Sequence, residues 1–161
     1  MRRIPDLYSE RPAMDRRLFL SFGSAAALAI AAAGFLFGRG RGPENLTLAS
    51  LSGEALAGDP SILLVDIRRP EEWQDTGVVE GALLLTYADR DSFLAAVRPH
   101  LQDGQSLALI CRTGNRTSRA TRQIAAAVQV PVIDVAGGMV RVLDEGYTPT
   151  PPTRAMGCTI C

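Results

Sequence analysis

Lysine is absent from the 161-residue sequence, and histidine occurs only once, as His100. The missing lysine excludes Schiff-base chemistry and the lysine of a phosphate-binding P-loop. A single histidine without a Gly-x-Ser-x-Gly motif argues against a Ser-His-Asp triad. We expect His100 to lie at the exposed end of a helix that Pro99 interrupts. Three scattered cysteines and one histidine give no zinc-ligand spacing, so we predict neither a metal nor a cofactor.

The net charge of zero is the sum of two regions with opposite net charges. Residues 1–43 hold seven arginines and three acidic residues, whereas residues 44–161 hold ten arginines and fourteen acidic residues, a net charge of −4. Nonspecific nucleic-acid binding depends on neutralising phosphates with basic side chains. The acidic balance of the second region therefore argues against a nucleic-acid partner.

The first region has the pattern of an export signal. Arg16 and Arg17 precede an uncharged run of 21 residues from Leu18 to Gly38, which gives a basic segment followed by an apolar one. The string RRLFL resembles the twin-arginine export signal, and Met14 is an alternative start. The run is also long enough to span a bilayer, so cleavage and retention as an anchor both remain open. We predict that residues 1–43 direct the rest of the chain, through the twin-arginine machinery, to a bacterial periplasm.

Within the second region, apolar runs alternate with helical patterns over residues 44–147. This alternation predicts an α/β fold with a parallel sheet of about five strands and helices on both faces. Ligands of such sheets bind beyond the carboxyl ends of the strands. The predicted strands are 46–50, 61–67, 81–87, 106–111 and 130–138, and the predicted helices are 50–60, 68–77, 89–100, 117–129 and 139–147.

Cys111 ends the fourth predicted strand and begins the loop CRTGNR, which leads into a helix. The helix amides and the charges of Arg112 and Arg116 favour the thiolate form of this side chain. A curled loop, permitted by Gly114 and Asn115, can direct several N–H groups at an anion. The alternative is a buried, inert cysteine, which the basic and turn-forming neighbours argue against.

The segment CRTGNRTSRA resembles the active-site loop of the single-domain rhodanese family of sulfurtransferases. The resemblance extends over about residues 46–147 and includes LLVDIRRPEEW and VAGGM. It implies that Cys111 attacks a small anionic sulfur donor such as thiosulfate and passes the sulfur to a thiol or to cyanide. The same resemblance implies that the resulting persulfide is bound by Arg112, Thr113, Gly114, Asn115 and Arg116. The chain departs from the family at GVVEGA, 77–82, where relatives have a Gly-His-Ile-Pro-Gly-Ala-like turn.

Loop length separates two chemistries on this type of fold. Four residues lie between Cys111 and Arg116, whereas phosphatases and arsenate reductases with a related loop place five there. The shorter loop favours sulfur transfer over hydrolysis of a phosphate. A sulfur carrier or redox module that does not turn over is a further alternative. We expect Thr117 or Ser118 to cap the helix behind the loop.

Several polar residues outside the loop have two interpretations. Asp66 and Arg68 are either supporting catalytic residues or, as we favour, an ion pair that fixes the turn after the second strand. We expect Trp73 to belong to the core. Glu71 and Glu72 are adjacent, so their side chains point apart, which is typical of a solvated helix face.

Residues 148–161 form a proline-rich tail that ends in a Cys-x-x-Cys motif. The prolines predict an extended, mobile segment. Cys158 and Cys161 are expected to form a disulfide in an oxidising compartment, which leaves Cys111 free. We consider two roles for this pair: a redox site that exchanges sulfur with Cys111 or electrons with a thioredoxin-like partner, and a terminal disulfide without a function.

Overall fold

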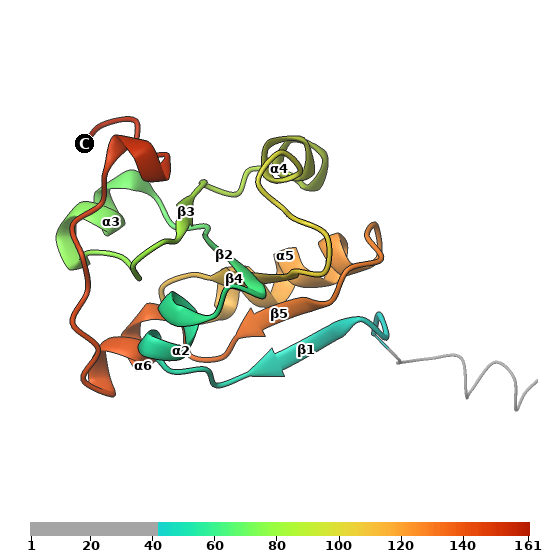
Figure 1. Cartoon of the computed structure of the whole chain (residues 1–161), viewed down its shortest axis with the longest axis horizontal. Helices are drawn as coiled ribbons and strands as arrows, with labels where there is room; N and C mark the ends of the chain where they lie inside the picture. Colours follow the sequence, from blue (N-terminus) through green and yellow to red (C-terminus); the bar gives the residue numbers. More distant parts are fainter. Residues whose placement is uncertain (1–41) are drawn as a thin grey trace, which may run out of the picture. The chain divides into compact units, whose positions relative to one another are not determined.

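The computed structural model of this chain describes residues 42–161. Its centre is a five-stranded sheet in which every neighbouring pair of strands is parallel (Figure 1). The strand order is β1-β5-β4-β2-β3. The predicted α/β fold with a five-stranded parallel sheet is therefore confirmed. The strands are β1 (Leu46–Ala49), β2 (Ile62–Asp66), β3 (Leu83–Leu84), β4 (Ser106–Ile110) and β5 (Val132–Val135).

Helices cover both faces of the sheet, as the alternation of the sequence predicts. Buried side chains of α2, α3 and α6 share one hydrophobic cluster, and those of α4 and α5 share the other. The helices are α2 (Gly53–Gly58), α3 (Pro70–Thr76), α4 (Arg90–Val97), α5 (Asn115–Ala125) and α6 (Gly138–Asp144), with a short 3-10 helix, η1, at Arg154–Met156.

The central strands are buried on both faces because their side chains alternate between the two clusters. Leu64 of β2 pairs with Ala108 of β4, and both side chains lie in the cluster with α2, α3 and α6. The next pair, Val65 and Leu109, lies in the opposite cluster. This alternation explains the continuous apolar runs of the sequence. It also places Cys111 at the carboxyl end of a fully enclosed strand.

Several predicted element boundaries differ from the structure, two of them for a clear physical reason. The third strand is only Leu83–Leu84, because this edge strand pairs with β2 alone and β2 ends at Asp66. Helix α5 begins at Asn115 rather than at residue 117, because Gly114 adopts a left-handed conformation (φ 90°) that ends the loop early.

The proline-rich tail packs against the domain, and the prediction of a mobile segment was wrong. Val78 and Thr150 exchange two backbone hydrogen bonds of 2.9 Å, and the chain then runs back beside α3 and β3 (Figure 1). Cys158 is buried in the same cluster as Trp73 and Leu84. Apolar burial therefore outweighs the extended preference of the prolines.

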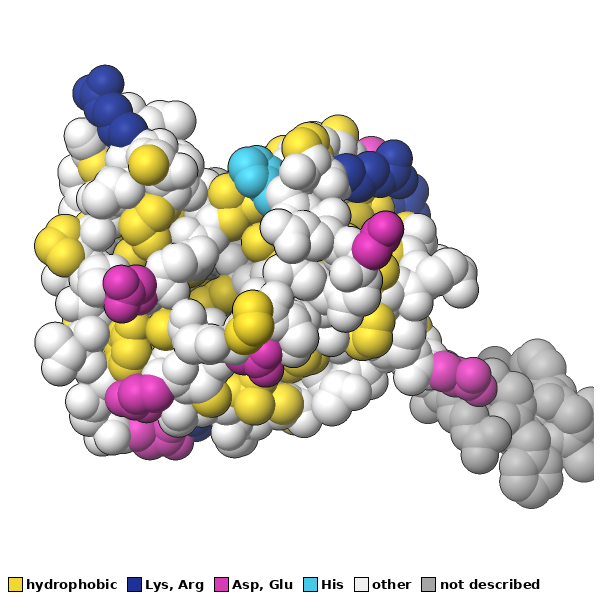
Figure 2. Space-filling model, in the orientation of Figure 1, with side chains coloured by type: hydrophobic (Ala, Val, Ile, Leu, Met, Phe, Trp, Pro, Cys, Tyr) yellow, Lys and Arg dark blue, Asp and Glu magenta, His cyan; other side chains and the backbone are white. Residues whose placement is uncertain are grey.

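The predicted export signal, with Arg16 and Arg17, lies outside the described residues. Within residues 42–161, no helix is long and apolar enough to cross a membrane. His100 is exposed just beyond α4, as expected. On the face in Figure 2, arginine side chains are few and lie apart from one another, so this face offers no continuous basic surface.

Candidate active site

Cys111 sits where the carboxyl end of β4 meets the amino end of α5. The backbone N–H of Gly114 donates a hydrogen bond to Cys111 Sγ over 3.2 Å. The first amides of a helix have no acceptor within the helix, and they carry partial positive charge. Gly114 thus places one peptide donor at a buried sulfur atom, next to the amino end of α5.

Helix α6 holds the cysteine loop from its other side. The N–H groups of Met139 and Val140 donate to the carbonyls of Cys111 (2.8 Å) and Arg112 (3.0 Å). This approach requires Gly138, because a Cβ atom there would lie 2.3 Å from the Cys111 carbonyl oxygen, and its φ is +61°. The close approach of α6 to the cysteine loop therefore explains why Gly138, the second glycine of the VAGGM segment, has no side chain.

The hydroxyl group of Thr117 supports the loop from inside α5. Thr117 Oγ1 donates to the carbonyl of Gly114 (2.9 Å) and lies 3.7 Å from Cys111 Sγ. Ser118 donates to the carbonyl of Asn115. The helix-capping role that we predicted for Thr117 or Ser118 was wrong, because the earlier start of α5 makes Gly114 the N-cap residue.

Arg116 does not direct its guanidinium at the sulfur atom. Its Nη1 and Nη2 atoms lie 2.7 and 2.6 Å from the two carboxylate oxygens of Glu72 on α3. This pairing lowers the pKa of Glu72 to about 2, although partial burial acts in the opposite direction. The expectation of a solvated face was therefore wrong for Glu72. Glu72 also accepts a hydrogen bond from the backbone N–H of Arg69, three residues earlier, in a capping arrangement.

A polar cavity of about 590 Å³ adjoins the cysteine loop. Arg112 is exposed at this cavity and forms no ion pair among the described residues. Thr113 and Asn115 are also exposed, so they stand at the surface of the loop. The cavity is lined by Arg69, Glu71, Glu72, Arg112 and Arg116. Because Arg116 is paired with Glu72, Arg69 and Arg112 are the guanidinium groups of this lining that remain outside an ion pair within residues 42–161, and the lining as a whole has a small positive balance over its two carboxylates.

Asp66 and Arg68 form a buried ion pair that ties β2 to α3. Arg68 Nη2 lies 2.7 Å from Asp66 Oδ2, and both side chains are almost fully enclosed. The other guanidinium donors bind Thr76 Oγ1 (2.6 Å) and the carbonyl of Gly77 (2.7 Å). Because these donors are already satisfied, the pair has the geometry of a structural element. Trp73 is buried beside it in the core, as predicted.

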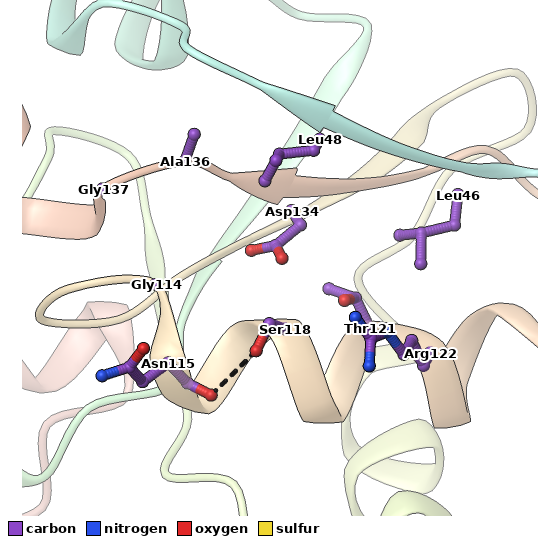
Figure 3. A pocket seen from close by; sticks show the side chains of 10 residues that line it. All are labelled: Leu46, Leu48, Gly114, Asn115, Ser118, Thr121, Arg122, Asp134, Ala136 and Gly137. Carbon is purple, nitrogen blue, oxygen red and sulfur yellow. Dashed lines mark hydrogen bonds between the residues drawn. The ribbon is translucent and has the colours of Figure 1, made fainter. Parts of the chain in front are cut away.

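Asp134 is a polar residue near the loop that the sequence patterns did not single out. It interrupts the apolar strand VIDV, which was the available signal, and its side chain is buried. The carboxyl group points from β5 toward α5 (Figure 3). It lines a second cavity, which also borders Gly114 and Gly137.

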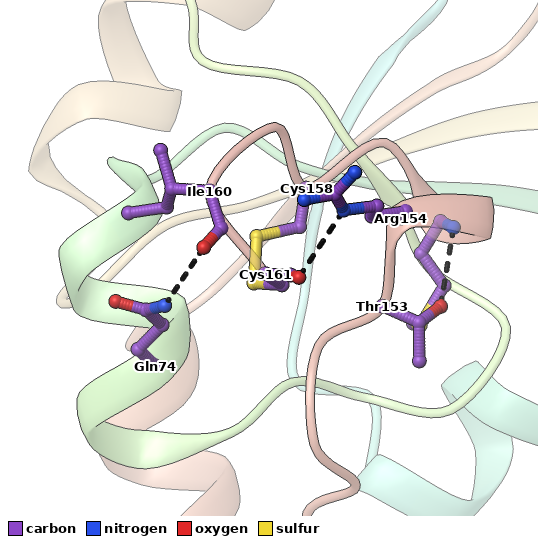
Figure 4. Close-up of a disulfide and its surroundings, with 7 residues drawn as sticks. Gln74, Thr153, Arg154, Cys158, Ile160 and Cys161 are labelled. Carbon is purple, nitrogen blue, oxygen red and sulfur yellow. Dashed lines mark hydrogen bonds between the residues drawn. A yellow bond between two sulfur atoms is a disulfide. The ribbon is translucent and has the colours of Figure 1, made fainter.

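Cys158 and Cys161 form the disulfide that their spacing predicts (Figure 4), and Cys111 is the free cysteine of the described residues. Cys158 packs in the cluster with α2, α3 and α6, whereas Cys111 packs in the cluster on the other face of the sheet. The structure therefore does not bring the tail cysteines together with Cys111.

Comparisons with known proteins agree with this fold. Residues 52–149, more than half of the chain, match the model of the rhodanese-like domain. The chain therefore belongs to the rhodanese-like domain family. No curated protein matches it.

Among solved structures, the chain is similar in fold to a rhodanese-related protein from Thermoplasma volcanium (23% identity, TM-score 0.50, covering 64% of this chain and 98% of that one). It is also similar to a protein of unknown function, described as a possible tyrosine phosphatase, from Rhodopseudomonas palustris (22% identity, TM-score 0.52, covering 64% and 85%).

Proposed function

We propose that this chain is a sulfurtransferase that carries sulfur on Cys111 as a persulfide. The observation on which this proposal rests is the hydrogen bond of 3.2 Å from Gly114 N–H to Cys111 Sγ, in a loop with only four residues between Cys111 and Arg116. A loop of this length suits a single bound sulfur atom. Membership of the rhodanese-like family supports the same reaction class.

In the proposed reaction, the Cys111 thiolate attacks the outer sulfur of thiosulfate. A new S–S bond forms, the S–S bond of thiosulfate breaks, and sulfite leaves with the electron pair. The persulfide anion then occupies the space before the first amides of α5, which stabilise its charge. A thiophilic acceptor, a thiol or cyanide, attacks the outer sulfur and takes it away, so the thiolate of Cys111 is restored.

Arg112 is well placed to attract the anionic donor in this proposal. Its side chain is exposed at the polar cavity, whereas Arg116 is already neutralised by Glu72. Cys111 itself is only 1% exposed. The donor must therefore come through the polar cavity and displace part of its wall to contact Sγ.

The decisive experiment is incubation of the purified protein with thiosulfate, followed by intact mass and peptide mapping. We expect a gain of one sulfur atom on Cys111, release of thiocyanate after addition of cyanide, and loss of both in Cys111→Ala. The double variant Cys158→Ser/Cys161→Ser is the matched control and should gain sulfur normally. A protein that gains no sulfur under these conditions would contradict the proposal.

Two other functions give different results in the same assay. A sulfur carrier would form the persulfide stoichiometrically without steady release of thiocyanate. A phosphatase would instead release phosphate from an aryl phosphate, and the description of one structural neighbour as a possible tyrosine phosphatase makes this substrate the appropriate comparison.

We also propose that residues 1–43 export the domain through the twin-arginine machinery to a bacterial periplasm. The proposal rests on Arg16 and Arg17 before the uncharged run. The double variant Arg16→Lys/Arg17→Lys should leave the protein protected from protease added to cells with a permeabilised outer membrane. Digestion of the variant to the same extent as the unmodified chain would contradict export by this signal.

A further inference from the structure

A second cavity, of about 300 Å³, lies between α5 and the β1–β5 edge of the sheet. On α5 it is lined by Asn115, Ser118, Thr121 and Arg122, whereas Arg116 lines the polar cavity beside the cysteine loop. Residues two apart on a helix do not share a face. The second cavity therefore opens on another face of α5, although Gly114 and Asn115 of the cysteine loop form part of its wall.

The floor of this cavity holds an unpartnered buried acceptor. Asp134 is 6% exposed, and its Oδ1 atom has no hydrogen-bond partner among the described residues. Burial raises the pKa of Asp134, while Thr117 and Arg122 act in the opposite direction. A buried oxygen without a donor is costly for a folded protein, and Figure 3 shows this carboxyl pointing toward Ser118 and Thr121.

The two neighbouring hydroxyl groups can add only acceptors. Ser118 Oγ donates its hydrogen to the carbonyl of Asn115 (3.1 Å), and Thr121 Oγ1 donates to the carbonyl of Thr117 (2.7 Å). Each hydroxyl has one hydrogen, so lone pairs remain for a ligand. The floor thus offers oxygens from Asp134 and Ser118, while Thr121 is fully buried. A primary ammonium group, with three N–H donors and no acceptor, complements such a set.

The rim of the cavity, in contrast to its acceptor-lined floor, carries a positive charge and an apolar wall. Arg122 is exposed and forms no ion pair among the described residues, and a guanidinium group binds a carboxylate through two parallel hydrogen bonds. Leu46 and Leu48, which alternate along β1 and so share a face, give an apolar wall. Leu48 is 69% exposed, which is unusual for a large apolar side chain in this domain.

We propose that this cavity binds a small zwitterion, an α-amino acid with an aliphatic side chain. Its ammonium group contacts Asp134 and Ser118, its carboxylate contacts Arg122, and its side chain lies on the leucine wall of β1. Each part of the ligand then meets the group that complements it. Arg122 is near enough to Asp134 to act on its titration, which agrees with the short spacing of the two charges in an α-amino acid.

Isothermal titration of the purified full chain with L-leucine tests this proposal. Two analogues isolate the charges: 3-methylbutylamine lacks the carboxylate, and 4-methylpentanoate lacks the ammonium group. We expect L-leucine to bind at least about tenfold more tightly than either analogue, which corresponds to the loss of one charged hydrogen-bond partner. An amine that binds as tightly as L-leucine, or absence of L-leucine binding, would overturn the proposal.

Variants locate the binding. Asp134→Asn and Arg122→Gln should each weaken L-leucine binding by about tenfold or more. Arg119→Gln, on the same helix but away from the cavity, should bind normally. Leu48→Asp keeps the test decisive if Asp134→Asn does not fold, because Leu48 is exposed and its substitution should weaken binding without unfolding. Cys111→Ser should bind L-leucine normally, which separates this site from sulfur transfer. Unchanged affinity in Asp134→Asn or Leu48→Asp would overturn the proposal.

Discussion

Arg116 and Glu72 meet in a two-point ion pair, with nitrogen–oxygen distances of 2.7 and 2.6 Å. The pair joins the first turn of α5 to α3, elements that are far apart in the sequence. Because Arg116 is occupied in this way, it braces the cysteine loop from outside, and the loop amides are left to act on sulfur. Four substitutions test this ion pair, the buried pair at Arg68, the close approach at Gly138 and the tail disulfide.

Glu72→Gln should reduce stability in a pH-dependent manner. The pKa of Glu72 falls from its ordinary value of 4.5 to about 2 in the folded protein. A lowered carboxyl pKa stabilises the fold above pH 4.5, and this contribution disappears as the pH falls to about 2. Because Arg116 is 41% exposed, solvent screening limits the contribution to about 1 kcal/mol. Urea unfolding between pH 2 and pH 6 measures it.

The adjacent variant Glu71→Gln is the control for this experiment. Glu71 is exposed and forms no ion pair among the described residues. Its unfolding curves should follow those of the unmodified chain at every pH. Equal pH dependence in Glu72→Gln and the unmodified chain would show that the ion pair does not stabilise the fold.

Arg68→Met should destabilise the domain strongly. The substitution leaves Asp66 as a buried carboxylate without its partner, and breaking such a pair costs about 3–5 kcal/mol. Thermal or urea unfolding provides the measurement. Arg90→Met removes an exposed pair with Asp91 and should have no measurable effect. A loss no larger than that of Arg90→Met would mean that the Asp66–Arg68 pair does not hold β2 against α3.

Gly138→Ala should disturb the cysteine loop itself. The new methyl group would collide with the Cys111 carbonyl, and the left-handed conformation adds strain, so we expect a loss of about 3 kcal/mol together with slower sulfur uptake from thiosulfate. Gly146 also has a left-handed conformation but has open space around it. Gly146→Ala should therefore lose only about 1–2 kcal/mol and take up sulfur at the normal rate. Equal behaviour of the two variants would refute the close-approach explanation.

Cys161→Ser separates a structural disulfide from a redox relay. Closing a ring this small contributes about 2 kcal/mol in the chain-entropy treatment, so the variant should unfold at a lower denaturant concentration. Sulfur uptake on Cys111 should not change, because Cys158 and Cys111 pack on opposite faces of the sheet. Loss of uptake in this variant would favour the relay, including one in which a thioredoxin-like protein reacts with the tail.

The sequence patterns predicted the layers of the fold and the cysteine loop because both depend on local chemistry. A short apolar run such as SILLVDI, bounded by turn residues, favours a buried strand, and CRTGNR joins a strand to a helix through Gly114. Partners distant in sequence were not predictable. Glu72 and Arg116 lie 44 residues apart, and nothing local distinguishes Glu72 from Glu71. The tail was misjudged for a similar reason, since proline content indicates extension but does not reveal the apolar surface that Cys158 covers.

The position of β4 has a consequence for how heating would affect the proposed sulfur transfer. This strand lies between β5 and β2 and is covered on both faces, and the Ile110 carbonyl at its end accepts from Ile67 N–H. Amides in such a strand exchange with solvent only when the whole domain opens. Cys111 follows directly, so heating should inactivate the protein and unfold it in one event, without an earlier melting of the loop.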